Sequence, residues 1–406
     1  MNHLRNSVHP GLRGAIYYGA YWGVIGMFEA FVTLHFINLG FSGAQIGWLA
    51  AVFPLFNFLI APPIARLADR KARRVQFLAV SILCYGLSLM LMALPTTFLT
   101  LLPVFALVMA TRAPAVPLAD SLVARMAERY KLDFGSMRLW GSIIFTLTST
   151  LLGVVWQKTG FQTMFVFSGM AFCLVALAAL LLEETGKPGV ESVTDLPPAT
   201  APTAQRWTLP EASILFLLAS NFLIVGSLFM VMTFGTVYMN LIGGSASQVG
   251  ALFGLSAMGE VPGMLFGRRL ARRLGDTNTL LLSLALIAIS FFGTAFSTEP
   301  WMMLVFGPVR GLGFGVYLVG TVTIINQRAP ENMYASYQGM LNSLCWGLAP
   351  LLSGPLGGLI YTNMGPATLF ITTAVLAILA GLLLLPTYRL WRQQPKLAAS
   401  QITQAE

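Results

Sequence analysis

Long apolar runs follow one another along the whole chain and are separated by short polar segments. Each run has about 20 residues or more, which is the length of helix that crosses the hydrocarbon core of a bilayer. Only 10% of the residues are charged, whereas soluble domains have about 25%. We therefore predict an all-α membrane protein with twelve transmembrane helices. The predicted spans cover residues 13–38, 44–67, 75–94, 98–124, 136–156, 163–182, 210–239, 248–268, 278–297, 300–327, 335–361 and 366–387.

A polar segment rich in Pro, Thr and Ala divides these spans into two sets of six. We predict an N-terminal half at 1–182, a flexible cytoplasmic linker at 183–208, and a C-terminal half at 209–406 with a short cytoplasmic tail. The two halves share a related basic loop after their second span, at 65–74 and 268–277. This repeat predicts two pseudo-symmetric halves of the same orientation in the membrane.

The basic residues are distributed asymmetrically between the two sides of the predicted spans. Nearly all of the 24 Lys and Arg residues fall on the side of the N-terminus, and Lys158 is the only one predicted on the other side. Because basic loops are retained in the cytoplasm, we expect a multi-pass protein of the cytoplasmic (inner) membrane with both termini in the cytoplasm.

Several classes of function do not fit the sequence. The net charge of +9 comes from membrane loops, so no nucleic-acid partner is expected. The three cysteines lie in apolar runs and the three histidines lack metal-ligand spacing, so no metal site is predicted. Nucleotide-binding loops and nucleophile motifs are absent, so we expect neither an enzyme nor a cofactor. The expected partners are the bilayer, a small solute and protons, and the protein is expected to be a monomer.

We single out six charged residues at or inside the predicted spans. A charge at the bilayer centre costs about 2.5–3.5 kcal/mol, so each should face a partner, a cavity or a ligand. Asp120 and Arg138 can neutralise each other across a helix pair. Glu260 can pair with Arg310, bind a solute or carry a proton. The six residues are Glu29, Arg112, Asp120, Arg138, Glu260 and Arg310.

Glu29 lies deep in the first span and is a candidate proton carrier, or a polar link to a neighbouring span. Arg112 precedes two prolines in the fourth span and can pair with Glu29 or with Asp120. The first span also has an aromatic, partly polar face, which suits interface anchoring, packing or contact with a ligand. That face consists of Tyr17, Tyr18, Tyr21 and Trp22.

Residues 65–74 have the sequence ARLADRKARR. This segment resembles the loop motif G-x-L-A-D-R-x-G-R-R of the major facilitator superfamily, with Ala65 and Ala72 in place of the two glycines. The resemblance implies a gate on the cytoplasmic side, whereas the alternative is that the basic residues only set the topology. The implied gating residues are Asp69, Arg70, Arg73 and Arg74.

Residues 135–142, with the sequence GSMRLWGS, resemble the fifth-span motif of phenylpropionate permeases and nucleoside:proton symporters, and the same stretch of lactose permease. Asp120 lies 18 positions before Arg138, a spacing similar to that of the sugar-binding acid and arginine of lactose permease. The resemblance implies the twelve-helix major facilitator fold and secondary transport by alternating access. With the cavity candidates of the second half, the predicted substrate-binding residues are Asp120, Arg138, Trp140, Ser142, Phe145, Glu260, Arg310, Asn221 and Trp346.

The sequence departs from lactose permease where that family carries its proton. Gly313 stands at the position of the proton-carrying glutamate, and Arg310 at that of a histidine. Another buried acid must then take up the proton. We rank Glu29 and Glu260 ahead of Asp120, because Arg138 can keep Asp120 ionised. The predicted coupling residues are Glu29, Glu260, Asp120 and Arg112.

Taken together, the residues and the resemblance favour a proton-coupled symporter for a sugar, a nucleoside or an aromatic acid. A drug:proton antiporter of the same fold is one alternative, although such proteins usually have a G-P-x-x-G-G-like motif in span five, which residues 142–156 lack. The alternative of another class is a non-transporting membrane sensor, which would not need the intramembrane charges.

Overall fold

The computed structural model describes residues 8–184, 212–328 and 334–393. Helices are the only regular secondary structure in these ranges, and twelve helical stretches are long and apolar enough to cross a membrane. The predicted all-α class with twelve spans is confirmed. The predicted linker at 183–208 lies outside the described residues except for Glu183 and Glu184, so the division of the chain there stays a prediction.

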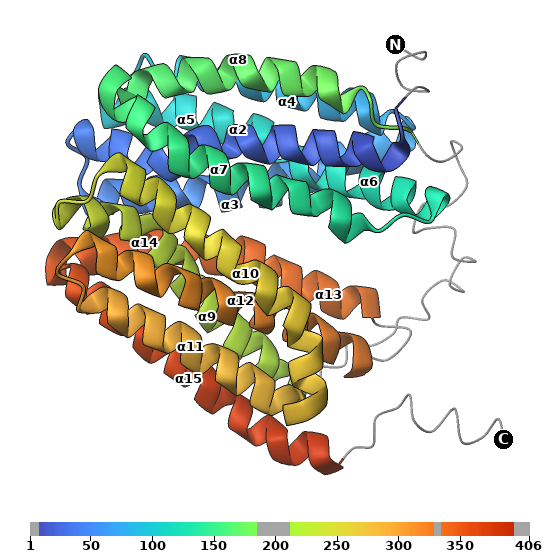
Figure 1. The fold of residues 1–406 in the computed structure, drawn as a ribbon, viewed down its shortest axis with the longest axis vertical. Coiled ribbons are helices and arrows are strands. Elements are labelled where there is room, and N and C mark those ends of the chain that lie inside the picture. The colour runs from blue at the N-terminus through green and yellow to red at the C-terminus, as the bar shows by residue number, and fades with distance from the viewer. Residues whose placement is uncertain (1–7, 185–211, 329–333, 394–406) are drawn as a thin grey trace. The chain divides into compact units, whose positions relative to one another are not determined.

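The helices group into two compact units (Figure 1). Unit 1 comprises residues 1–39 and 55–209, and unit 2 comprises residues 40–54 and 210–406. Helix α3 (Gly43–Arg70) contributes its first part to unit 2 and the rest to unit 1. The other helices of unit 1 are α2 (Pro10–Asn38), α4 (Arg74–Leu91), α5 (Phe98–Arg112), α6 (Ala115–Tyr130), α7 (Phe134–Thr159) and α8 (Phe161–Ala179).

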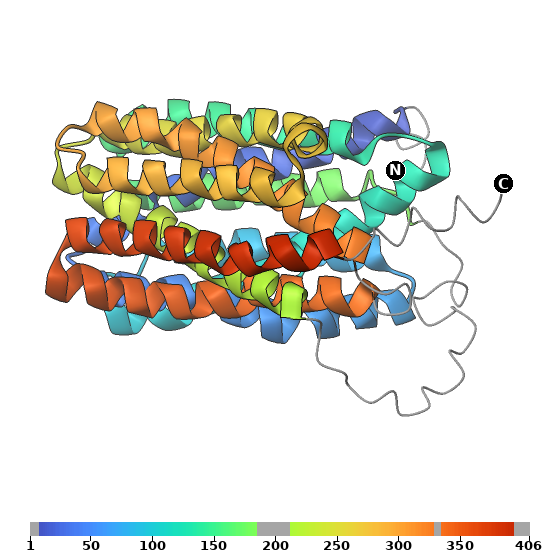
Figure 2. The same ribbon diagram turned by 90° about the horizontal axis from the view of Figure 1, so that it is seen from below.

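Unit 2 contains the remaining helices of the described chain. They are α9 (Ala212–Leu241), α10 (Ala246–Leu274), α11 (Asp276–Ala295), α12 (Pro300–Arg328), α13 (Tyr334–Ser343), the π-helical turn η1 (Leu344–Leu348), α14 (Ala349–Met364) and α15 (Pro366–Gln393). Helix α11 packs against both α12 and α15, and these orange and red helices lie side by side in Figure 2.

Helix α2 packs along α7 and α8 in unit 1 (Figure 1). A Cβ atom at Gly26 would lie 2.7 Å from the carbonyl oxygen of Phe145, so only glycine permits this approach of α7. Thr148 Oγ1 donates to the Gly23 carbonyl at 2.9 Å, and Trp156 Nε1 donates to the Met27 carbonyl at 2.6 Å. These contacts fix the rotation of α2 about its own axis and thus the direction of its polar side chains.

The fourth span consists of two helices because Pro114 and Pro117 interrupt it. Proline has no backbone N–H, so the carbonyls four residues earlier lose their usual helical donors. Helix α5 therefore ends at Arg112, and α6 begins at Ala115. The break leaves Arg112 in the last turn of α5, where the carbonyl end of the helix favours a positive charge.

Helices α10 and α12 of unit 2 approach each other through glycines. A Cβ atom at Gly311 would lie 1.9 Å from the Ser256 carbonyl oxygen, and one at Gly315 would lie 2.4 Å from the Glu260 carbonyl oxygen. Glycine at these two positions therefore permits the close packing of α12 against α10. Contact between the two backbones also brings the polar side chains of Glu260 and Arg310 onto adjacent surfaces.

The loop between α3 and α4 contains a strained residue. Ala72 has φ = +49°, in the left-handed region that costs a residue with a Cβ atom about 1–2 kcal/mol. Ala72 stands where the loop motif of the resembling superfamily has its second glycine. Ala65, at the position of the first glycine, lies instead inside α3.

We expect Ala72→Gly to stabilise the protein and Ala65→Gly to destabilise it. Glycine at position 72 relieves the left-handed strain, and after the greater chain entropy of glycine is counted the net gain is about 0.5–1 kcal/mol. At position 65 there is no left-handed strain to relieve, so the greater chain entropy of glycine lowers the free energy of unfolding by about 0.5–1 kcal/mol. Thermal unfolding of the purified protein measures both shifts, and equal shifts of the same sign would contradict the assignment of strain.

Candidate functional site

An ion pair with a buried guanidinium joins α5 to α2. Arg112 Nη2 donates to both carboxylate oxygens of Glu29, at 3.0 and 2.9 Å. The side chain of Arg112 is 10% exposed and that of Glu29 is 38% exposed. The sequence left the partner of Arg112 open between Glu29 and Asp120, and the structure shows that it is Glu29.

A second polar cluster surrounds Asp120 of α6. Tyr18 of α2 donates its hydroxyl to Asp120 Oδ1 at 2.6 Å, and Arg138 Nη1 of α7 lies 3.9 Å from Asp120 Oδ2. The predicted neutralisation of Asp120 by Arg138 is confirmed as a long ion pair. Tyr18 is the nearer partner, which the sequence analysis missed, although the aromatic face of the first span was a signal for it.

These distances change the basis on which the coupling residues were ranked. The sequence analysis ranks Asp120 last because of its expected pairing with Arg138. The Arg112–Glu29 contact at 2.9 Å is shorter than the Arg138–Asp120 contact at 3.9 Å. A nearby cation disfavours protonation of a carboxylate, and Glu29 has the nearer cation. A preference for Glu29 as the proton carrier therefore needs a different physical reason.

Helix α7 presents Arg138, Ser142 and Phe145 on one face, because residues at i, i+4 and i+7 lie above one another on a helix. Trp140 is two positions from Arg138, which places it on a different face. It is 51% exposed, and Ile143 and Leu147 continue its exposed apolar stripe. The structure thus keeps Ser142 and Phe145 with Arg138 but does not bring Trp140 to them.

In unit 2, Arg310 of α12 is 7% exposed. Its Nε atom donates a long hydrogen bond of 3.4 Å to Ser256 Oγ of α10. Glu260, one turn further along α10, lies within electrostatic range of the guanidinium. The predicted proximity of Glu260 and Arg310 is confirmed, and Ser256 is an additional partner that sequence reasoning missed.

A small cavity lies inside unit 2, between α9, α12 and the helix that contains η1. Its volume of about 50 Å³ has room for a few water molecules. Asn221 and Trp346, both predicted to bind substrate, line it, and Asn221 Oδ1 lies 3.9 Å from Cys345 Sγ. Cys345 and Trp346 belong to the π-helical turn, a feature that is frequent at functional sites.

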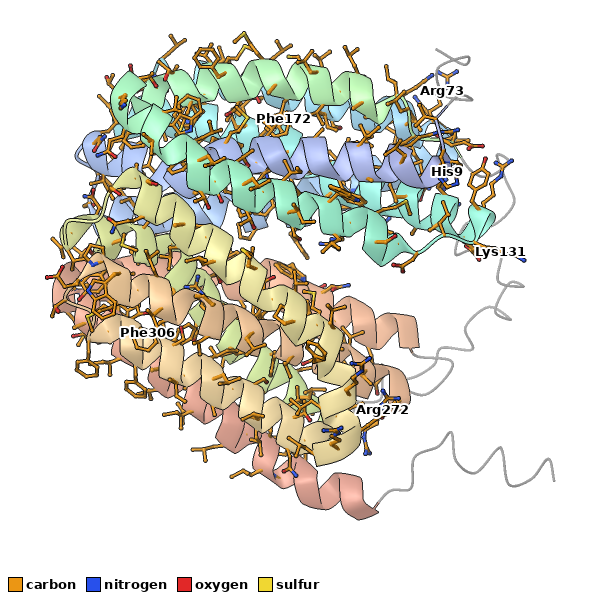
Figure 3. All side chains as sticks on the ribbon, in the orientation of Figure 1. His9, Arg73, Lys131, Phe172, Arg272 and Phe306 are labelled. Atoms are coloured by element: carbon orange, nitrogen blue, oxygen red, sulfur yellow. The ribbon has the colours of Figure 1, made fainter. Side chains whose placement is uncertain are left out.

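The predicted gating loop contains an ion pair between Asp69 and Arg74. Arg74 is buried and also lies 3.8 Å from Glu184, whose other carboxylate oxygen accepts from the backbone N–H of Val75 at 2.9 Å. Arg70 and Arg73 are exposed. Figure 3 shows Arg73 at the same end of unit 1 as His9 and Lys131, so the basic loops of this unit gather at one end of its helices.

Glu183 connects three further side chains at the end of unit 1. It accepts from Arg129 Nη1 and from the Tyr130 hydroxyl, each at 2.9 Å, and Arg13 Nη1 lies 3.6 Å away. The start of the predicted linker is therefore attached to α2 and α6. Among the described residues, no group of three or more His, Cys, Asp or Glu side chains is arranged to hold a metal ion.

Comparisons with known proteins agree with this architecture. A family model described as the MFS_1 like family matches residues 12–372. The maltose permease of Geobacillus stearothermophilus is 23% identical over 346 residues, which cover 85% of this chain and 86% of the permease. The probable 3-phenylpropionic acid transporter of Escherichia coli (strain K12) is 25% identical over 300 residues, which cover 72% and 76% of the two chains. A crystal structure of the nucleoside transporter NupG has a TM-score of 0.76 at 16% identity and covers 94% of this chain and 99% of that chain, which shows a common fold.

We expect Glu29→Gln to destabilise the protein more than the double substitution Glu29→Gln with Arg112→Gln. The single change leaves a buried guanidinium without its counter-charge, which costs about 3 kcal/mol. The double change removes both charges and recovers part of this loss. A double-mutant cycle on thermal unfolding measures the coupling, and purely additive effects would show that the pair contributes no interaction energy.

Proposed function

Because the chain belongs to the MFS_1 like family and is a membrane transporter of the major facilitator type, we propose that it couples the transport of a small organic solute to protons. In this proposal the protein is a symporter of the cytoplasmic membrane, with both termini in the cytoplasm. The observation that carries the coupling is the buried Glu29–Arg112 pair inside two membrane-spanning helices.

Glu29 is the proposed proton site because its protonation would remove the counter-charge of a buried guanidinium. Neutral Glu29 would leave the guanidinium of Arg112, which is 10% exposed, without its counter-charge. Protonation of Asp120 would release Arg138, whose side chain is 50% exposed and can be solvated. A conformational equilibrium responds only to a binding event that stabilises one state more than another. Protonation of Glu29 should therefore shift the conformational equilibrium strongly, and protonation of Asp120 should shift it much less.

The proposed solute contacts in unit 1 are Asp120, Arg138, Ser142 and Phe145. Asp120 offers acceptor oxygens, and the half-exposed guanidinium of Arg138 offers a planar fork of donors for hydroxyl or carboxylate groups. In unit 2 we keep Glu260, Arg310, Asn221 and Trp346 as proposed contacts. Trp140 is left out because it lies on another face of α7.

The maltose permease and the probable 3-phenylpropionic acid transporter suggest two solute classes for a screen, a disaccharide and an aromatic acid. A nucleoside is the third class, from the likeness of residues 135–142 to nucleoside symporters. The proposed gate residues Asp69, Arg70, Arg73 and Arg74 serve any of these solutes. A drug:proton antiporter remains the alternative, and the direction of solute movement along an imposed proton gradient distinguishes it from a symporter.

We expect proteoliposomes with the parent protein to accumulate one of these solutes when an inward proton gradient is imposed. Glu29→Gln should abolish this accumulation while sparing exchange of labelled for unlabelled solute, because exchange requires no net proton movement. The matched control is Glu299→Gln, a change of the same chemistry near the start of α12. Accumulation by the Glu29→Gln protein at the parent rate would exclude Glu29 as the proton site.

Arg138→Lys should weaken solute binding about tenfold, since lysine keeps the charge but loses the paired donors of the guanidinium. Arg129→Lys is the control, because Arg129 is exposed and pairs with Glu183 at the end of unit 1. A thermal-shift titration with the transported solute measures both affinities. Near-parent affinity in the Arg138→Lys protein would contradict a forked contact with the solute.

A further inference from the structure

Three tyrosine side chains of unit 1 are buried together with their hydroxyls. Tyr17, Tyr21 and Tyr85 are 1%, 2% and 0% exposed. Within the described part of the chain, the hydroxyls of Tyr17 and Tyr85 have no hydrogen-bond partner, and the hydroxyl of Tyr21 lies beside the guanidinium of Arg112 without a well-aligned hydrogen bond. A buried hydroxyl that makes no hydrogen bond costs about 1–3 kcal/mol, and nearly all such groups in proteins bind a protein atom or an ordered water.

The three rings belong to one aromatic cluster. Tyr17 and Tyr21 lie one turn apart on α2 and stack with their centroids 6.0 Å apart. Phe172 of α8 contacts both Tyr21 and Tyr85, with centroid distances of 5.8 and 4.5 Å. Figure 3 shows Phe172 part of the way along unit 1, away from its ends. The cluster therefore lies inside the unit.

The carboxylates of Asp120 and Glu29 flank this cluster. Tyr18, next to Tyr17, donates to Asp120, and Glu29 pairs with Arg112 further along α2. Eleven residues of helix between Tyr18 and Glu29 correspond to about 16 Å. This rise separates the two positions of α2 at which the carboxylates are held, so we infer that an exchange of protons between them needs intermediate groups.

The tyrosine hydroxyls occupy the interval between the two carboxylates. Tyr21 lies within electrostatic range of Glu29 and Arg112 and also of Asp120. Tyr17 lies within range of Asp120, and Tyr85 within range of Glu29 and Arg112. Arg138 lies 3.9 Å from Asp120, so this guanidinium is a further charge next to the region.

We propose that water molecules bound to the hydroxyls of Tyr17, Tyr21 and Tyr85 form a proton route between the carboxylates of Glu29 and Asp120. Each hydroxyl is both a donor and an acceptor, and a buried water makes about three hydrogen bonds. In each step a hydroxyl accepts a proton from one water and gives its own proton to the next. One proton moves in total, and every tyrosine ends neutral.

Water suits these hydroxyls better than the transported solute does. All three rings are almost completely buried, whereas Asp120 and Arg138 are 33% and 50% exposed. A solute can therefore reach Asp120 and Arg138 without contacting the cluster. The route rests on the proposed proton coupling, but the binding of water to the hydroxyls does not.

Hydroxyl-radical labelling by synchrotron radiolysis tests the waters without any solute. Radicals form from bound water and modify neighbouring side chains even where bulk solvent is excluded. We expect modification of Tyr17, Tyr21 and Tyr85 in the purified full-length protein in lipid nanodiscs. Tyr238 is the control, because its hydroxyl donates to the Ser297 carbonyl at 2.6 Å and it should stay unmodified. Absence of label at all three tyrosines, with exposed Tyr130 labelled, would overturn the proposal.

Tyr21→Phe tests the route, because it keeps the ring contacts and removes only the hydroxyl. We expect proton-driven solute uptake to fall about tenfold or more, with solute exchange within about twofold of the parent rate. Tyr238→Phe is the matched control and should change neither rate. If Tyr21→Phe does not fold, Tyr17→Phe is the second variant, and we expect it to lower proton-driven uptake by the same factor while sparing solute exchange.

The outcomes separate this inference from the proposed function. Parent-like, proton-driven uptake by the Tyr21→Phe protein would overturn the route and leave the symporter assignment intact. A parent protein that ignores the proton gradient would overturn the coupling and the route together. The labelling result would still show whether water occupies the cluster.

Discussion

The guanidinium of Arg112 is the constraint on which unit 1 depends. A cation buried inside a membrane-spanning helix is costly unless an anion lies against it, and Glu29 is that anion. The pair requires α2 and α5 to be neighbours and requires α5 to end where it does. The interruption at Pro114 and Pro117 meets the second requirement, since it leaves Arg112 at the carbonyl end of a helix.

Close backbone approach through glycine is what makes such pairs geometrically possible. In unit 1, Gly23 and Gly26 bring α7 against α2 and fix its rotation. In unit 2, Gly311 and Gly315 do the same for α12 against α10. In each case the glycines lie on the contact face and the ionisable residues lie beside it. Small residues thus take up the helix contact and leave the longer polar side chains free to meet next to it.

The twelve spans were predictable because length and hydrophobicity alone decide whether a helix can cross a membrane. The partner of Arg112 was not, because an antiparallel register between α2 and the α5–α6 pair is a tertiary property. That register places Tyr18 opposite Asp120 and Glu29 opposite Arg112, and no spacing in the sequence encodes it. Trp140 lies on a different face of α7 from Arg138, because residues two positions apart point to different faces of a helix. The π-helical turn at Leu344–Leu348 also carries no composition signal.

Asp120 and Glu29 illustrate why proton coupling depends on what protonation does to the surrounding charges as well as on affinity for the proton. Asp120 lies beside the Tyr18 hydroxyl and a distant, half-exposed guanidinium. If Asp120 loses its charge, water can solvate that guanidinium without any movement of the helices. Glu29 neutralises a cation that solvent hardly reaches, so a change in its charge must be compensated by movement or by another anion. A change of conformation that brings another anion or water to Arg112 would offer that compensation. Symport then requires that solute binding favour the same conformation as proton binding at Glu29.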